Sequence, residues 1–224
     1  MTTKALAKFT AELCYEKLSA HSIEMAKKCL LDWLGIAIRG SQEKPVRIIH
    51  DVILQGDAPQ ANISAAFLPK GRRLNAAFIN SAASHSLDFD DLHNPSIIHP
   101  ACVVVSPALA VCEAEHKSGK QLIAAICAGY EASGRVGEAV IPESYFFWHT
   151  TGTAGTIAAG AAAANALGLD AQQTLMCYAA PAPSRRPVGI SQRRCHEQAA
   201  AHGQGFLQRC PQRLSVAEGF YCSQ

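Results

Sequence analysis

The chain has 224 residues, of which 49% are hydrophobic and 17% charged, and its net charge is +2. This length suffices for one good-sized core or two small ones, and the low charge argues against a binder of nucleic acid or membrane surfaces. No apolar run reaches the roughly 18 residues of a transmembrane helix, and the first residues lack the pattern of a signal peptide. Nine scattered cysteines without a CxxC pair indicate reduced thiols, so we expect a cytoplasmic protein.

The spacing of apolar residues predicts helices along most of the first 90 residues. Ser22 is the expected N-cap of the second helix and Gly40 its stop. Pro45 is suited to the first turn of the third helix, because proline is tolerated there. The predicted elements of this half are helices over 6–18, 22–40, 45–56 and 74–87 and an extended piece over 62–68.

The second half of the chain also has a helical pattern, with predicted helices over 103–116, 120–138 and 152–167. The last of these consists almost entirely of Gly, Ala, Thr and Ile. Helices with such small side chains usually lie in the middle of a bundle, where backbones approach closely. We therefore expect an all-α, bundle-like domain with helix-on-helix packing.

Residues 85–100 concentrate the side chains that could do chemistry, with three His and three Asp: His85, Asp88, Asp90, Asp91, His93 and His99. Three interpretations compete. His and carboxylates suit divalent metal ions, although neither an HExxH nor an EF-hand spacing is present. The residues could instead only cap helices and form salt bridges. The third interpretation is acid–base catalysis, because carboxylates held beside imidazoles have their pKa values pushed apart.

A second candidate segment, WHTTGTAGT, spans residues 148–156. His149 precedes Thr and Gly at the start of an apolar helix, which places an imidazole, hydroxyls and free backbone N–H groups together. Such a helix start could bind a substrate carboxylate. The alternative is a capping segment whose histidine only satisfies local hydrogen bonds.

Four blocks, in this order, carry a resemblance to a known family: LLDWLGIAIRG, AAFINSAASHSLDFDD followed by HP, GYEASGRVGEAV and HTTGTAGTIAAGAAAANALGLD. The sequence resembles the MmgE/PrpD family, which includes 2-methylcitrate dehydratase, cis-aconitate decarboxylase and iminodisuccinate epimerase. The resemblance runs from about residue 5 to about residue 178. It implies an all-helical domain followed by a smaller α/β domain, with the active site between them.

The resemblance also implies a homodimer that acts on small di- or tricarboxylic acids without a metal or an organic cofactor. Asp88, His99 and His149 match the acid–base residues of the family. Leu92 departs from the family pattern, because a Thr often follows the DFDD block, and this change leaves the substrate open. The matching substrate-binding positions are Asp91, His93, Asn94 and Thr151.

The composition changes at about residue 180. From Pro181 onward there are six Arg and no Lys, without a helical period, so we expect a helical domain over 1–180 and a disordered, aberrant tail over 181–224. Members of the family that this sequence resembles have a Lys and a His in a motif further along the chain. In this chain the last Lys is Lys120. An alternative function is that of a non-catalytic helical interaction protein whose Arg-rich tail binds an acidic partner.

We interpret this tail as the product of a frameshift near residues 179–183. One choice of synonymous codons for RRPVGIS (residues 185–191) encodes AGLWEF when read one base later. One choice of codons for QRRCHEQAAAHGQG similarly encodes SDDAMSKQLHTAK, and both strings resemble the family's continuation. We therefore expect little or no catalysis by the 224-residue chain, because the cation and the second domain of the family would be lost.

Sequencing the gene across codons 175–225 and several hundred bases beyond tests this interpretation. The shifted frame should stay open and encode the remainder of a family member, and the restored protein should then be assayed on polycarboxylates. A shifted frame that closes at once would show that residues 181–224 are a true part of the protein. Turnover of a family substrate at an enzyme-like rate by the 224-residue protein would likewise contradict the expected inactivity.

Overall fold

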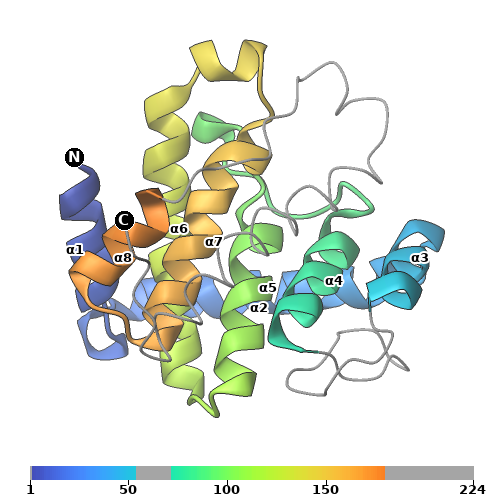
Figure 1. Cartoon of the computed structure of the whole chain (residues 1–224), viewed down its shortest axis with the longest axis horizontal. Coiled ribbons are helices and arrows are strands. Elements are labelled where there is room, and N and C mark those ends of the chain that lie inside the picture. Colours follow the sequence, from blue (N-terminus) through green and yellow to red (C-terminus); the bar gives the residue numbers. More distant parts are fainter. Residues whose placement is uncertain (1, 54–71, 180–224) are drawn as a thin grey trace.

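A computed structural model describes residues 2–53 and 72–179 of the chain (Figure 1). Over these two ranges the protein is all-α, as predicted, and an isolated bridge between His93 and Ile98 is the only β-type pairing there. In chain order the elements are α1 (Thr3–Glu12), η1 (Tyr15–Lys17), α2 (Ala20–Gly40), α3 (Lys44–Ile53), α4 (Arg73–His85), η2 (Asn94–Ser96), α5 (Pro100–Ala114), α6 (Gly119–Val140), η3 (Glu143–Phe146), α7 (Thr150–Leu167) and α8 (Ala171–Ala179).

Helix α7 lies at the centre of the bundle, against α5, α6 and α8 (Figure 1). Its side chains are almost all Ala, Gly or Thr, and most of them are buried. The neighbouring helix α5 is apolar on nearly every face and equally buried. Because small side chains let helix backbones approach closely, the sequence of α7 fits the middle of the bundle, as predicted.

Two glycines mark where the helices come closest. A Cβ on Gly129 of α6 would lie 2.5 Å from Val104 Cγ1 of α5 and 3.0 Å from Ala162 Cβ of α7. On α7 itself, a Cβ on Gly155 would lie 3.1 Å from Val103 Cγ2. The packing of α5, α6 and α7 therefore depends on the missing side chains of these glycines.

Helix α2 crosses behind this core and packs on α4 and α5. Trp33 anchors it, since the ring is fully buried and its Nε1–H donates a hydrogen bond of 3.1 Å to Ser106 Oγ. The prediction that Ser22 caps this helix was wrong. Ser19 is the N-cap, and its Oγ accepts a hydrogen bond of 3.0 Å from the backbone N–H of Ser22. Ser22 is therefore the residue that is capped, three positions after the cap.

The prediction of one continuous helix over 6–18 was also wrong. Helix α1 ends at Glu12, Leu13 is extended, and η1 follows. Asn165 of α7 explains this break, because its Nδ2 donates to the carbonyl oxygens of Thr10 and Leu13 at 2.7 and 2.9 Å. These carbonyls, at the end of α1, are thus satisfied by a side chain from a helix far away in sequence, which periodicity alone does not reveal.

Helix α8 was not predicted, and it pairs with α1 at one side of the bundle (Figure 1). Thr10 Oγ1 and Tyr178 OH are hydrogen-bonded at 2.7 Å between these two helices. The predicted extended piece over 62–68, the end of the third helix at Gly56 and the predicted tail over 181–224 lie outside the described residues. Among the described helices, none is both long and apolar enough to cross a membrane.

We predict that Gly129→Ala lowers the free energy of unfolding by about 1–3 kcal/mol, because the new methyl group overpacks the contact with α5 and α7. Gly35→Ala is the matched control, since it lies inside α2 with nothing within 4 Å of an added Cβ. That substitution should be neutral or stabilising by up to about 1 kcal/mol. Urea unfolding of both variants measures the difference, and equal effects would contradict the close approach.

Candidate active site

Three helix ends meet at the candidate site. Helix α4 ends at His85, α5 begins after its N-cap His99, and α7 begins after its N-cap His149. Pro100 stands in the first turn of α5, where the missing N–H of proline costs no hydrogen bond. The connection from 86 to 99 leads from α4 to α5, so the residues predicted from the sequence lie at converging ends of packed helices.

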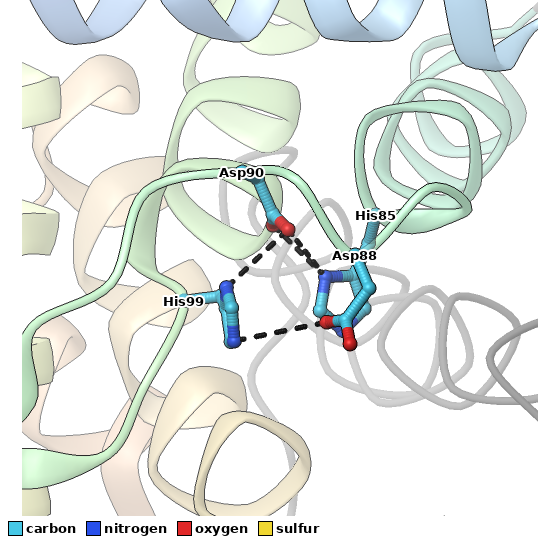
Figure 2. A group of neighbouring side chains, drawn as sticks. All are labelled: His85, Asp88, Asp90 and His99. Atoms are coloured by element: carbon cyan, nitrogen blue, oxygen red, sulfur yellow. Dashed lines mark hydrogen bonds and ion pairs between the residues drawn. The ribbon is translucent and has the colours of Figure 1, made fainter. Parts of the chain in front are cut away.

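Asp90 is the centre of a buried cluster (Figure 2). Its carboxylate oxygens lie 2.9 and 3.0 Å from His85 Nδ1, and Oδ1 lies 3.3 Å from His99 Nδ1. The other ring nitrogen of His99, Nε2, lies 3.9 Å from Asp88 Oδ1. The side chains of His85 and Asp90 are 0% exposed, that of His99 is 19% and that of Asp88 is 53%, so the cluster meets solvent through Asp88 and His99.

Burial and charge act in opposite directions on the two central groups. Burial by itself would raise the pKa of Asp90, but the hydrogen bond and charge of His85, together with His99, hold that pKa well below the usual range. Burial by itself would lower the pKa of His99, but the carboxylates of Asp90 and Asp88 outweigh it and raise that pKa above its ordinary value. The cluster therefore favours an ionised Asp90 beside a His99 that protonates readily.

His149 has the opposite electrostatic character. Burial, reinforced by the charges of His85 and His99, lowers its pKa to about 4, so it is neutral near pH 7. Its Nδ1 accepts a hydrogen bond of 3.3 Å from the backbone N–H of Gly152, which requires a bare Nδ1 and puts the proton on Nε2. The ring lies 6.4 Å from that of His85, centroid to centroid. His149 is thus a hydrogen-bond donor through Nε2.

Thr151, predicted to bind substrate, is fully buried, and its Oγ1 accepts a hydrogen bond of 3.1 Å from the backbone N–H of His99. This contact ties the first turn of α7 to the start of α5. Asp88 has a φ of 52°, in the left-handed region that is unfavourable for most residues but tolerated by Asp. Such strain, on the order of 1 kcal/mol or more, is typical of functional sites.

The other predicted substrate-binding residues are turned away from this cluster. Asp91 Oδ1 accepts from Ala101 N–H at 2.9 Å and Oδ2 from Tyr130 O–H at 2.8 Å, so its carboxylate caps α5 and anchors α6. Burial raises the pKa of Asp91, although these two donors oppose the effect. With Leu92 and His93, Asp91 lines a separate cavity of about 620 Å³ bordered by α1, α2 and α6.

His93 lies on that side as well. His93 Nδ1 and Ser96 Oγ are hydrogen-bonded at 2.7 Å, and His93 Nε2 lies 3.8 Å from a carboxylate oxygen of Glu138 on α6. Asn94 is exposed at the start of η2. The structure therefore brings Asp88, His99, His149 and Thr151 together, but directs Asp91 and His93 toward the separate cavity and leaves Asn94 exposed.

The family model for the MmgE/PrpD N-terminal domain matches residues 4–187. The chain belongs to the MmgE/PrpD family. Among its relatives, the cis-aconitate decarboxylase of Mus musculus is 31% identical over 75% of this chain and 36% of its own length. For the Homo sapiens enzyme these values are 30%, 68% and 33%. The cis-aconitate decarboxylase-like protein oryM of Aspergillus oryzae is 25% identical over 98% of this chain and 45% of its own length.

This MmgE/PrpD chain thus spans between about a third and a half of the length of these relatives. The family and the all-α fold predicted from the sequence are confirmed. The alignment with the Aspergillus oryzae protein covers nearly all of the chain, and so runs beyond residue 180. The out-of-frame interpretation of residues 181–224 stays a prediction.

His85 and Asp90 were not distinguished by sequence from the polar residues around them. The available signal was the position of His85 as the last residue of a helix that is otherwise buried, with a carboxylate five residues later. No sequence pattern distinguishes Asp90 from Asp88 and Asp91, because the loop has no periodicity. Only its tertiary neighbours identify Asp90 as the central carboxylate.

His85, Asp88, Asp90 and His99 also form a group that could hold a metal ion, since one donor atom from each lies within 4.8 Å of the others. Both oxygens of Asp90, however, are already directed at His85 Nδ1 and one of them also at His99 Nδ1. This arrangement suits hydrogen-bonded acid–base groups better than direct coordination by Asp90. The metal interpretation remains the alternative that elemental analysis of the pure protein would decide.

The low pKa of His149 predicts a loss of stability in acid. Its pKa of about 4 in the folded state lies below the ordinary value near 6.5, so the unfolded chain binds more protons between these values. The free energy of unfolding should therefore fall as the pH is lowered from 6.5 to 4. His149 alone should contribute a loss on the order of 2 kcal/mol in this window.

Urea unfolding of wild type and His149→Asn at several pH values measures this contribution, because Asn keeps the N-cap function but does not titrate. The variant should lose less stability in acid than wild type. His116→Gln, at the exposed far end of α5, controls for the removal of a histidine. Parallel pH profiles of wild type and His149→Asn would show that His149 does not have the low pKa described.

Proposed function

We propose that this chain provides the acid–base residues of a lyase acting on small di- or tricarboxylic acids, with decarboxylation of cis-aconitate as the first reaction to test. Membership of the MmgE/PrpD family supports the class, and the relatives named cis-aconitate decarboxylases support the substrate. Dehydration and epimerisation of related acids are the other reactions that the same residues could catalyse. Leu92 leaves the choice between these substrates open.

The observation that carries the proposal is the opposite surroundings of the ring nitrogens of two neighbouring histidines. His99 has Nδ1 beside the ionised Asp90 and Nε2 on the side of Asp88, so Nε2 is the nitrogen that gains and loses a proton. His149 has a bare Nδ1 and a proton on Nε2, and it stays neutral. One histidine can therefore transfer protons while the other donates a hydrogen bond.

These roles fit the chemistry of polycarboxylic acids. When CO₂ leaves, the electron pair of the broken C–C bond shifts through the adjacent double bond, and the carbon that gains charge must take a proton. Protonated His99 can supply this proton from Nε2, because its raised pKa increases the charged fraction near neutral pH. In a dehydration or epimerisation, neutral His99 would instead remove a carbon-bound proton.

The substrate carboxylates require donors. His149 Nε2–H is one, and the first turn of α7 adds backbone N–H groups at the positive end of the helix dipole. Asp88, which is half exposed and 3.9 Å from His99 Nε2, can exchange the proton of His99 with solvent. Thr151 holds the backbone of His99 in place during these steps.

Three further expectations from the sequence are part of this proposal: a homodimer, which the resemblance implies, a cytoplasmic location, which the cysteines indicate, and a domain division near residue 180, where the composition changes. Sedimentation velocity tests the dimer, and limited proteolysis tests the division. A protease-resistant core that ends near residue 180 would support the division. A core that extends well past this residue would contradict it.

The catalytic assignment is tested by prolonged incubation of the 224-residue protein with ¹³C-labelled cis-aconitate, followed by NMR of the products. We expect slow decarboxylation above the buffer background, and His99→Gln should reduce it by about 100-fold or to background, since an acid–base group typically contributes a factor of about 10²–10⁴. His149→Asn should mainly weaken binding, observed as a higher KM.

His116→Gln is the matched control, because it removes a histidine from the opposite end of α5 and should leave the rate unchanged. Binding is measured independently from shifts of the backbone amide signals of Thr151 and Gly152 on addition of tricarboxylates. The proposal would be wrong if neither binding nor turnover occurred with any polycarboxylate. It would also be wrong if His99→Gln retained the wild-type rate.

A further inference from the structure

Asp90 contacts two histidine rings at once, and both contacts are made through Nδ1 (Figure 2). Because the carboxylate is ionised and can only accept, the 2.9 and 3.0 Å contacts require a proton on His85 Nδ1. The contact with His99 is longer, at 3.3 Å, and it is an ion pair that does not have the geometry of a hydrogen bond. A bare Nδ1 on His99 would nevertheless place its lone pair against a negative charge.

We propose that Asp90 is a positioning residue for His99: its buried carboxylate, held by His85, keeps the proton of neutral His99 on Nδ1 and so makes Nε2 the basic nitrogen. The inference deepens the proposed function and rests on it, because it names the residue that orients the proton-transfer group. The side chain of Asp90 is 0% exposed, so it is closed off from solvent. It acts only through the imidazole that it contacts.

The surroundings of Asp90 leave it little freedom. His85 is fully buried at the end of α4, and its ring lies 5.0 Å from that of His99, centroid to centroid. Cys102 is buried beside them, and burial together with the charge of Asp90 raises the pKa of its thiol well above the ordinary value, so it stays neutral. Its Sγ donates to the carbonyl oxygen of His99 at 3.3 Å.

The remaining groups around His99 also support this proton arrangement. Asp88 lies on the Nε2 side at 3.9 Å, where it stabilises the ring once Nε2 is protonated. The backbone N–H of His99 donates to Thr151 Oγ1, which fixes the backbone from which the ring extends. Asp91, one residue after Asp90, is directed instead at Ala101 and Tyr130.

Replacement of the carboxylate by an amide, in Asp90→Asn, gives a specific expectation. The new side chain would have one accepting oxygen and one donating NH₂ group. The oxygen should stay with His85, which makes the shorter contacts, and the NH₂ group should then face His99 Nδ1. His99 must respond by moving its proton to Nε2, and the basic nitrogen would be turned away from the reacting side.

The test is the ¹⁵N spectrum of the imidazole nitrogens in ¹⁵N-histidine-labelled 224-residue protein, at a pH where His99 is neutral, with His99→Gln to assign the signals. In wild type we expect a protonated Nδ1 and a bare Nε2 on His99. In Asp90→Asn the two should exchange. Asp91→Asn is the matched control, since it removes the neighbouring carboxylate without touching His99, and it should leave the wild-type pattern.

A wild-type spectrum with the proton on Nε2 of His99 would overturn the inference, and this measurement needs no variant to fold. An unchanged pattern in a folded Asp90→Asn protein would also overturn it. Where turnover is measurable, Asp90→Asn should lower kcat by roughly 10²–10⁴-fold with little change in KM, as expected for a wrong tautomer. The expected spectra with neither binding nor turnover of any polycarboxylate would refute the proposed function but leave the proton arrangement of Asp90 and His99 intact.

Discussion

The close approach of α7 to α5 and α6 is the constraint on which the site depends. Gly129 and Gly155 permit this approach, because a Cβ at either position would lie 2.5–3.1 Å from a valine of α5. Once the three helices are packed this tightly, the starts of α5 and α7 are fixed relative to each other. The hydrogen bond from His99 N–H to Thr151 Oγ1 then joins these two starts directly. The small side chains of α7 therefore set the geometry of the candidate site as well as the packing of the core.

The meeting of helix ends also explains why two histidines of the same type acquire different properties. His99 precedes α5 and contacts carboxylates from the loop, which raise its pKa. His149 precedes α7, is used as an N-cap through Nδ1 and has imidazoles as its charged neighbours, so its pKa falls to about 4. The difference arises from what each ring contacts, because both rings are largely removed from solvent.

Helical periodicity and composition were enough to predict the all-α fold and the central position of 152–167, since both depend on patterns that local sequence contains. They were not enough to place Ser19 rather than Ser22 as a cap, because both are serines with the same intrinsic preference.

Asp88, His99 and His149 were predicted through matched motifs, and the structure brings them together. The separation of Asp91 and His93 from this group could not be predicted, since the left-handed backbone at Asp88 and the contacts of Asp91 with Ala101 and Tyr130 decide which way each side chain points.

In the proposed function, the charges of the cluster separate the residue that transfers protons from the groups that bind substrate. Asp88 and Asp90 contribute two carboxylates, and protonated His99 contributes one positive charge, so these three residues do not attract a polycarboxylate by themselves. Attraction must come from the donors beside them, which are the neutral His149 and the positive end of α7. Because Asp90 is buried and paired, its charge acts on His99 and is kept at a distance from solvent. The exposed Asp88 is then the carboxylate whose charge an incoming anion meets first.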